Sequence, residues 1–115
     1  MRRHKFRETL VVIILSVMAQ GETHGYDIIR TVERITYGNV KLSPGTLYPL
    51  LFIMRREGLI KVVKVDEAGR KKKVYCLTPK GKEYLAKHIH PVIKRLKLLV
   101  NFLEDVSNIL TDEQS

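Results

Sequence analysis

The 115-residue sequence contains no tryptophan and only one cysteine. A lone Cys76 cannot form a disulfide within the chain, so the fold must be held by packing and hydrogen bonds, and a reducing compartment is favoured. The length is enough for one domain with a modest core and too short for two.

Long hydrophobic runs are also missing. The most apolar stretch, Leu10–Ala19, has about half of the ~20 residues that a membrane-spanning helix needs. Basic residues precede it, as in a signal peptide, but no A-x-A-like cleavage site follows. Removing the stretch would take much of the apolar material from a small core. We therefore expect a buried helix in a cytoplasmic protein that has no membrane partner.

Acidic residues are few relative to basic ones. The chain has 12 Asp and Glu against 21 Lys and Arg, a formal net charge of +9. Residues 1–80 hold 16 basic and 7 acidic side chains, whereas residues 81–115 hold 5 of each. An excess of this size predicts an anionic partner that meets the first two-thirds of the chain.

The residue patterns that catalysis requires are not found. The sequence has no nucleophile with a base and an orienting group, no Gly-rich phosphate loop and no pair of acids with an evident pocket. His88 and His90 are two positions apart, so on a helix they point in different directions and make a poor metal pair. Two solvent-facing histidines are the simpler interpretation. We expect no enzyme activity, metal or cofactor.

Hydrophobic spacing and turn residues predict the elements of one small domain. In the second helix Thr23 can act as the cap, and Tyr26, Ile29, Val32 and Ile35 fall on one face. Two later runs are strand-like and are separated by a polar, Gly-containing turn, which is typical of a β-hairpin. The expected helices are Phe6–Gln20, His24–Tyr37, Ser43 to the stop at Gly58, and a last helix from Thr78-Pro79; the expected strands are Leu59–Val65 and Lys72–Thr78.

The start of the third helix is the first candidate site. Ser43 is a good N-cap, and Pro44 fits the first helical position because its missing N–H would have no helical partner there. Gly45 and Thr46 leave the helix end uncluttered, and Tyr48 follows one turn later. A helix N-terminus attracts phosphate, and helix-turn-helix proteins place such an end in the major groove. A purely structural helix start is an equally good interpretation of these residues alone.

The hairpin is the second candidate site. Four consecutive cations, Arg70, Lys71, Lys72 and Lys73, are expected at its tip, where they repel one another unless solvated or matched by anions. A solubilising face is the usual meaning of such a run. Beside an open helix end, a hairpin "wing" that follows a phosphate backbone is the better interpretation. A basic cluster at Arg2–Arg7 is expected to be a loosely ordered tail that adds nonspecific phosphate contacts.

The last helix has the clearest period in the chain. Its apolar residues are spaced alternately four and three apart, which defines an a/d seam, and Pro91 should kink the helix or split it near His90. The seam either packs onto the domain or pairs with a second chain. Dimerisation is favoured because the seam is longer than a small domain can cover. The seam residues are Leu85, Ile89, Val92, Leu96, Leu99, Leu103, Val106 and Leu110.

Four short motifs, in order and spacing, resemble the PadR family of transcriptional regulators. They are HGYDI from His24, GTLYPLL from Gly45, EGLI from Glu57 and VYCLTPKG from Val74. The resemblance spans residues 24–81 and is specific only as a linked set. The single C-terminal helix resembles the compact subgroup of that family.

The resemblance implies a fold that is mostly α with a β-hairpin. Residues 1–80 would form a winged helix-turn-helix domain with a basic N-terminal tail, and residues 81–115 a dimerisation helix assisted by the first helix. Ser43, Gly45, Thr46 and Tyr48 would lie at the recognition helix, and Arg70–Lys73 at the wing. Some relatives hold flat aromatic compounds with a tryptophan of the last helix; here Phe102 is the only aromatic in the late seam.

These observations predict a homodimer that binds double-stranded DNA at palindromic promoter sites, usually as a repressor, with release by a small molecule as an option. The alternative is a winged-helix module that binds a protein or an RNA without operator specificity, because the fold alone does not fix the partner.

Overall fold

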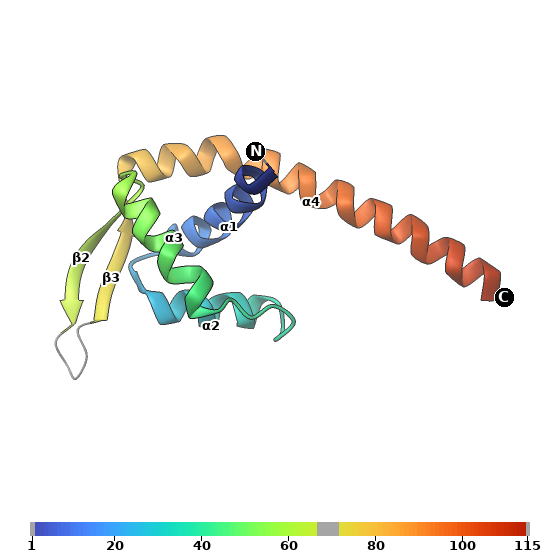
Figure 1. The fold of residues 1–115 in the computed structure, drawn as a ribbon, viewed down its shortest axis with the longest axis horizontal. Helices are drawn as coiled ribbons and strands as arrows, with labels where there is room; N and C mark the ends of the chain where they lie inside the picture. The colour runs from blue at the N-terminus through green and yellow to red at the C-terminus, as the bar shows by residue number, and fades with distance from the viewer. Residues whose placement is uncertain (1, 67–71, 115) are drawn as a thin grey trace.

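The computed structural model describes residues 2–66 and 72–114. It is mostly helical with a small antiparallel sheet, as predicted (Figure 1). The expected turn of the hairpin falls on residues 67–71, outside the described part. The elements are α1 (Arg2–Met18), β1 (Thr23–His24), α2 (Gly25–Ile35), α3 (Pro44–Arg56), β2 (Ile60–Asp66), β3 (Lys72–Leu77) and α4 (Pro79–Gln114).

The sheet has three strands rather than the two expected, in the order β1-β3-β2. The additional strand is short, and it pairs Thr23 with Tyr75 and His24 with Val74. Thr23 is therefore a strand residue, and the prediction that it caps α2 is wrong: the cap position is held by His24, without a side-chain hydrogen bond. The short strand fixes the start of α2 against the wing.

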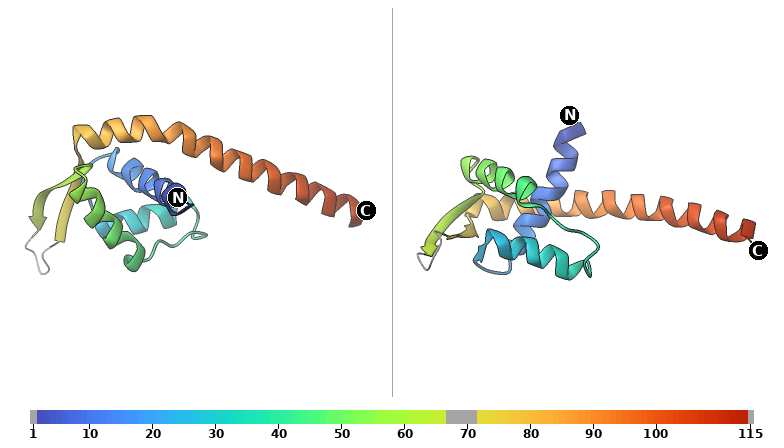
Figure 2. Two further views of the ribbon diagram at one scale, coloured as in Figure 1. Left: turned by 45° about the horizontal axis from the view of Figure 1, so that its top comes forward. Right: turned by 60° about the horizontal axis from the view of Figure 1, so that its bottom comes forward.

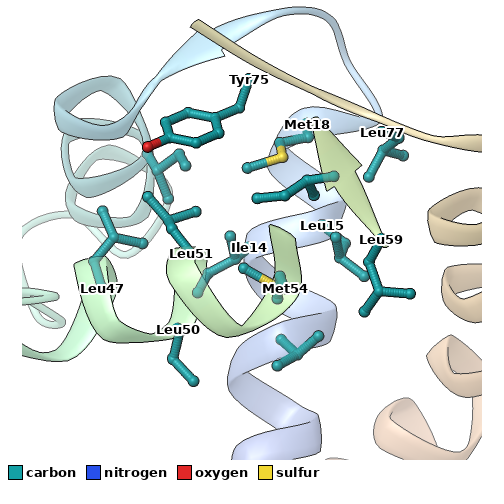
Figure 3. Close-up of a cluster of buried hydrophobic side chains, with 13 residues drawn as sticks. Ile14, Leu15, Met18, Leu47, Leu50, Leu51, Met54, Leu59, Tyr75 and Leu77 are labelled. Atoms are coloured by element: carbon teal, nitrogen blue, oxygen red, sulfur yellow. The ribbon is translucent and has the colours of Figure 1, made fainter. Parts of the chain in front are cut away.

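The core lies where α1, α3 and the sheet meet (Figure 3). Ile14 and Leu15 of α1 are fully buried, so the most apolar stretch of the sequence is used inside the domain. The helical spacing of α3 points Leu47, Leu51 and Met54 into the same core. Among the described helices, none is long and apolar enough to cross a membrane.

Hydrogen bonds of Thr78 join the wing to the start of α4. Thr78 Oγ1 donates a hydrogen bond to Gly58 O at 2.5 Å and accepts one from Gly81 N at 3.0 Å. Thr78 N–H also donates to Leu59 O at 3.1 Å. Gly81 is buried and packs against the Leu59 carbonyl oxygen. A Cβ at this position would lie 2.0 Å from Leu59 O. Only glycine fits here, and this contact sets where α4 leaves the domain.

Helix α4 is continuous over 36 residues with Pro91 inside it. A split near His90 is therefore wrong, whereas Figure 1 shows the helix changing direction along its length. Glu8 of α1 holds both sides of the proline: its Oε2 lies 2.5 Å from His88 Nδ1, and its Oε1 lies 2.8 Å from Arg95 Nη2. His88 also stacks on Tyr84, so it is not the solvent-facing residue that we expected.

Beyond this contact α4 extends away from the domain (Figure 2). The radius of gyration is 17.0 Å, against about 13 Å for a compact chain of this length. The principal extents are 60 × 31 × 24 Å. Half of α4 therefore has no packing partner within the described chain.

The Glu8 contact predicts a pH dependence of stability. The hydrogen bond from Arg95, and then the one with His88, lowers the pKa of Glu8 below its ordinary value of 4.5. The stabilisation is thus fully present above pH 4.5 and is lost as the pH falls through the lower folded-state pKa. We expect Glu8→Gln to lower the free energy of unfolding by about 1–2 kcal/mol at pH 7. The difference should be smaller at pH 3 than at pH 7 in denaturant titrations. Glu83→Gln, at an exposed position of α4, is the control, and an equal loss at both pH values would contradict the assignment.

Candidate nucleic-acid interface

The N-terminus of α3 is exposed and capped as predicted. Ser43 is extended (φ −81°, ψ 153°), its Oγ accepts the Thr46 N–H at 3.2 Å, and Pro44 begins the helix. Ser43 Oγ also donates to Thr46 Oγ1 at 3.1 Å. Ser43, Gly45 and Thr46 are all exposed. Since Ser43 already accepts from Thr46 and Leu47, the first-turn N–H that a phosphate can use is that of Gly45.

Tyr48 lies against the start of α2. It is half-exposed, at 46%, and a Cβ on Gly25 would lie 2.9 Å from its ring. The missing side chain of Gly25 is therefore what lets the phenol lie across the junction of α2 and α3. Burial of that junction also raises the pKa of the neighbouring Tyr75 phenol.

The wing lysines meet the same junction. Lys72 and Lys73 are exposed at the start of β3, and with Tyr48 they line a recess of about 280 Å³. Arg70 and Lys71 lie outside the described residues. Of the predicted wing cations, the structure thus brings the two described ones next to the start of α3. The recess is lined by His24, Gly25, Tyr26, Tyr48, Lys72, Lys73 and Tyr75.

Tyr26 is a component of this site that sequence reasoning placed wrongly. The buried face of α2 consists of Gly25, Ile28 and Val32, not the face that carries Tyr26. Its ring instead has Lys72 Nζ at 4.7 Å and the Arg30 guanidinium at 5.0 Å from its centroid. These cation–π contacts orient Lys72 of the wing and Arg30 of α2 around the same ring. The spacing of four between Tyr26 and Arg30 was the available signal.

The outward face of α3 holds further residues that the sequence did not single out. Phe52 is 64% exposed, and the Arg56 guanidinium lies 5.9 Å from its ring centroid. With Arg55 they line an open recess of about 310 Å³. These two arginines add positive charge to the exposed side of α3.

The seam of α4 divides into two parts. Leu85 and Ile89 are half-buried and Val92 is buried, all packed on the domain. From Leu96 onward the seam residues are exposed, together with further apolar side chains beside them. An apolar groove of about 400 Å³ lies between α1, α2 and the segment of α4 from Ile89 to Leu96.

No group of three or more His, Cys, Asp and Glu able to hold a metal occurs among the residues that the structure describes.

Comparison with known proteins gives one consistent family. Residues 14–87 match the model of the "Transcriptional regulator PadR-like family". The chain is 34% identical over 86 residues to the transcriptional regulator YqjI of Escherichia coli. The aligned region covers 73% of this chain and 40% of YqjI. It is 36% identical over 72 residues to the transcriptional regulator Rv3488 of Mycobacterium tuberculosis, covering 63% of this chain and 64% of Rv3488. The chain thus spans less than half the length of YqjI.

Two solved structures share the fold. A PadR-like transcriptional regulator from Bacillus cereus has a TM-score of 0.66 at 30% identity, covering 90% of this chain and 97% of its own. Bacillus subtilis PadR, solved in complex with operator DNA, has a TM-score of 0.61 at 29% identity, covering 68% of this chain and 45% of its own. The family comprises transcriptional regulators and not enzymes, and the fold is its winged helix. The family match over most of the domain, together with a winged-helix fold, shows that this chain belongs to the PadR-like family of transcriptional regulators.

Proposed function

We propose that this chain is a sequence-specific DNA-binding regulator that acts as a homodimer on palindromic promoter sites, usually as a repressor. The observation that carries the proposal is the convergence of the capped α3 end, Tyr48 and the wing lysines on one exposed surface. The complex of Bacillus subtilis PadR with operator DNA supports it, because that relative shares the fold. A cytoplasmic location and release by a small molecule belong to the same proposal.

In this proposal α3 enters the major groove with its N-terminus foremost. The Ser43 hydroxyl and the Gly45 N–H contact phosphates at the groove edge, and the Thr46 hydroxyl is within reach of a base edge. Lys72 and Lys73 contact the flanking backbone and add affinity that does not depend on sequence. Tyr48 lies between these contacts and those of the wing, within reach of a base edge as well as of the sugar-phosphate backbone.

The second copy is proposed to pair along α4. The exposed part of the seam carries Leu99 (57%), Leu103 (62%) and Leu110 (54%), which need a partner surface in water. At ~100° per residue, the exposed apolar side chains of this segment cover roughly 200° of the helix circumference. That width suits contact with more than one helix of the partner. A two-fold axis here would place two α3 helices about 34 Å apart, one turn of DNA.

A protein- or RNA-interaction module without operator specificity is the second candidate. The exposed aromatics Phe52 (64%) and Tyr37 (93%) favour it, because exposed aromatic side chains are common at protein interfaces. Titrations of duplex DNA and RNA at the same salt concentration separate the two candidates: tighter RNA binding would favour the second.

Lys72 and Lys73 should contribute affinity alike on every duplex. We expect Lys72→Ala with Lys73→Ala to weaken binding to cognate and to random DNA by the same factor. The slope of log affinity against log salt concentration should become shallower by about 2. Thr46→Ala or Tyr48→Phe should reduce the ratio between cognate and random binding, by up to about tenfold if a base edge is contacted. Fluorescence anisotropy at several salt concentrations measures both quantities.

Lys94→Ala with Lys97→Ala removes two exposed lysines of α4 and is the matched control. It should change the slope little. Equal losses on cognate and random DNA for both the wing and the α3 variants would contradict this division of roles.

A further inference from the structure

The third turn of α3 carries an aromatic side chain on its outermost line. The buried face of the helix consists of Leu47, Leu50, Leu51 and Met54. At ~100° per residue, Phe52 lies roughly 150° from the centre of that face. Its side chain is 64% exposed, although the preceding residue, Leu51, is buried in the core. Phe52 therefore projects away from the domain in the direction that a recognition helix presents to DNA.

The surroundings of Phe52 are basic. Arg55 and Arg56 line the same recess of about 310 Å³, and the Arg56 guanidinium lies 5.9 Å from the ring centroid. This cation–π contact orients the ring and places a positive charge at its edge. An apolar group rimmed by guanidinium groups fits a partner surface that is anionic at its borders and apolar at one point.

The outermost line of α3 has a restricted chemistry. Gly45, Pro49, Phe52 and Arg56 follow one another at helical spacing and are all exposed. None is an Asn or Gln, which would bond adenine, and none is an Asp or Glu, which would accept from cytosine. In the major groove the apolar feature of a base edge is the C5-methyl group of thymine. The chemistry of this line therefore matches thymine better than adenine or cytosine.

We propose that Phe52 is a specificity-determining residue that contacts a thymine methyl group in each half of the DNA site. The inference rests on the proposed function, because it requires α3 to lie in the major groove. Arg55 and Arg56 act beside it as phosphate or guanine contacts. Phe52 thus supplies sequence discrimination, whereas the wing lysines supply affinity.

The test removes only the methyl group. A duplex is first selected from a random library with the full chain, and each thymine is then replaced by deoxyuridine. Burying one methyl group corresponds to about a fourfold change in affinity, so a symmetric pair of replacements should weaken binding about fifteenfold. Phe52→Ala should bind the selected duplex more weakly and should not distinguish thymine from deoxyuridine at that position.

Two variants control for the protein. Phe52→Leu keeps an apolar side chain and should retain part of the methyl sensitivity. Tyr37→Ala removes an aromatic side chain that is 93% exposed but lies beyond the end of α2. This variant should retain the full methyl sensitivity. Because Phe52 is exposed, both of its variants should show the circular dichroism and melting temperature of the natural chain.

The outcomes separate the inference from the function on which it rests. Specific binding with a methyl sensitivity that Phe52→Ala leaves unchanged, or with no methyl sensitivity at any position, would overturn the role of Phe52 and leave the DNA-binding proposal standing. Failure of the natural chain to select any duplex would reject the proposed function, and the inference with it.

Discussion

Leu99→Asp combined with Leu103→Asp is expected to convert the protein from a dimer into a folded monomer. Both leucines are more than half exposed within one chain, at 57% and 62%, so the change should leave the domain intact. In a dimer joined along α4 they would be buried, and buried carboxylates without partners cost several kcal/mol. We expect the dimer dissociation constant to rise by about 100-fold or more, as measured by sedimentation equilibrium. Affinity for a two-half-site duplex should fall with it, because one α3 cannot span both halves.

The control adds the same charge to the other side of the helix. Asn101 and Asn108 lie about 180° from the seam at ~100° per residue, so Asn101→Asp with Asn108→Asp should leave the dimer in place. A natural chain that is already monomeric at micromolar concentration, or a leucine double variant that remains dimeric, would reject α4 as the interface.

Gly81→Ala is expected to destabilise the domain strongly. The new methyl group would lie 2.0 Å from Leu59 O, which is itself hydrogen-bonded to Thr78. Relief requires movement of backbone at the junction of wing and α4. Overpacking of this kind costs about 3 kcal/mol, or roughly 10–20 °C in melting temperature for a chain of this size. Thermal unfolding followed by circular dichroism measures it.

Gly45→Ala is the matched comparison. A Cβ on Gly45 has its nearest neighbour, Ser43 Oγ, at 3.9 Å, so the substitution should leave the melting temperature unchanged or slightly raised. If both glycine variants melted at the temperature of the natural chain, the junction would not have the tight geometry described above.

Local signals in the sequence were enough for the elements of the domain. Ser43 followed by Pro44 identified the start of α3, because a cap and a first-turn proline depend only on adjacent residues. The buried face of α3 is also encoded locally, because Leu47, Leu51 and Met54 stand at helical spacing. The two strand-like runs and the turn between them likewise identified the β2–β3 hairpin from neighbouring residues. The family motifs are also short segments of the chain, and the family is confirmed.

Contacts between distant residues were not accessible in this way. Thr23 is a strand residue because it pairs with Tyr75, and no property of the segment around Thr23 reveals that partner. Glu8 holds both His88 and Arg95, which explains why Pro91 does not split α4. Tyr26 was assigned to the apolar face because an aromatic at helical spacing is usually buried, whereas the approach of Lys72 makes it a platform for a cation.

The roles of the site residues remain proposals for a related reason. The structure brings Tyr48, Lys72 and Lys73 around one recess, but an exposed hydroxyl or ammonium group has the same conformation whether its partner is a phosphate or water. In the proposed dimer, the exposed half of α4 is buried against the second chain, which a single chain does not show.

Footprinting of the purified protein on the DNA upstream of its own coding sequence tests the central claim most directly. A dimer that presents two α3 helices about 34 Å apart predicts a symmetric protected site with two half-sites one helical turn apart. Protection should weaken steeply between 50 and 200 mM salt, by roughly 10³–10⁵ in affinity for ~6–10 phosphate contacts. Uniform protection without symmetry, or none at low salt, would contradict it.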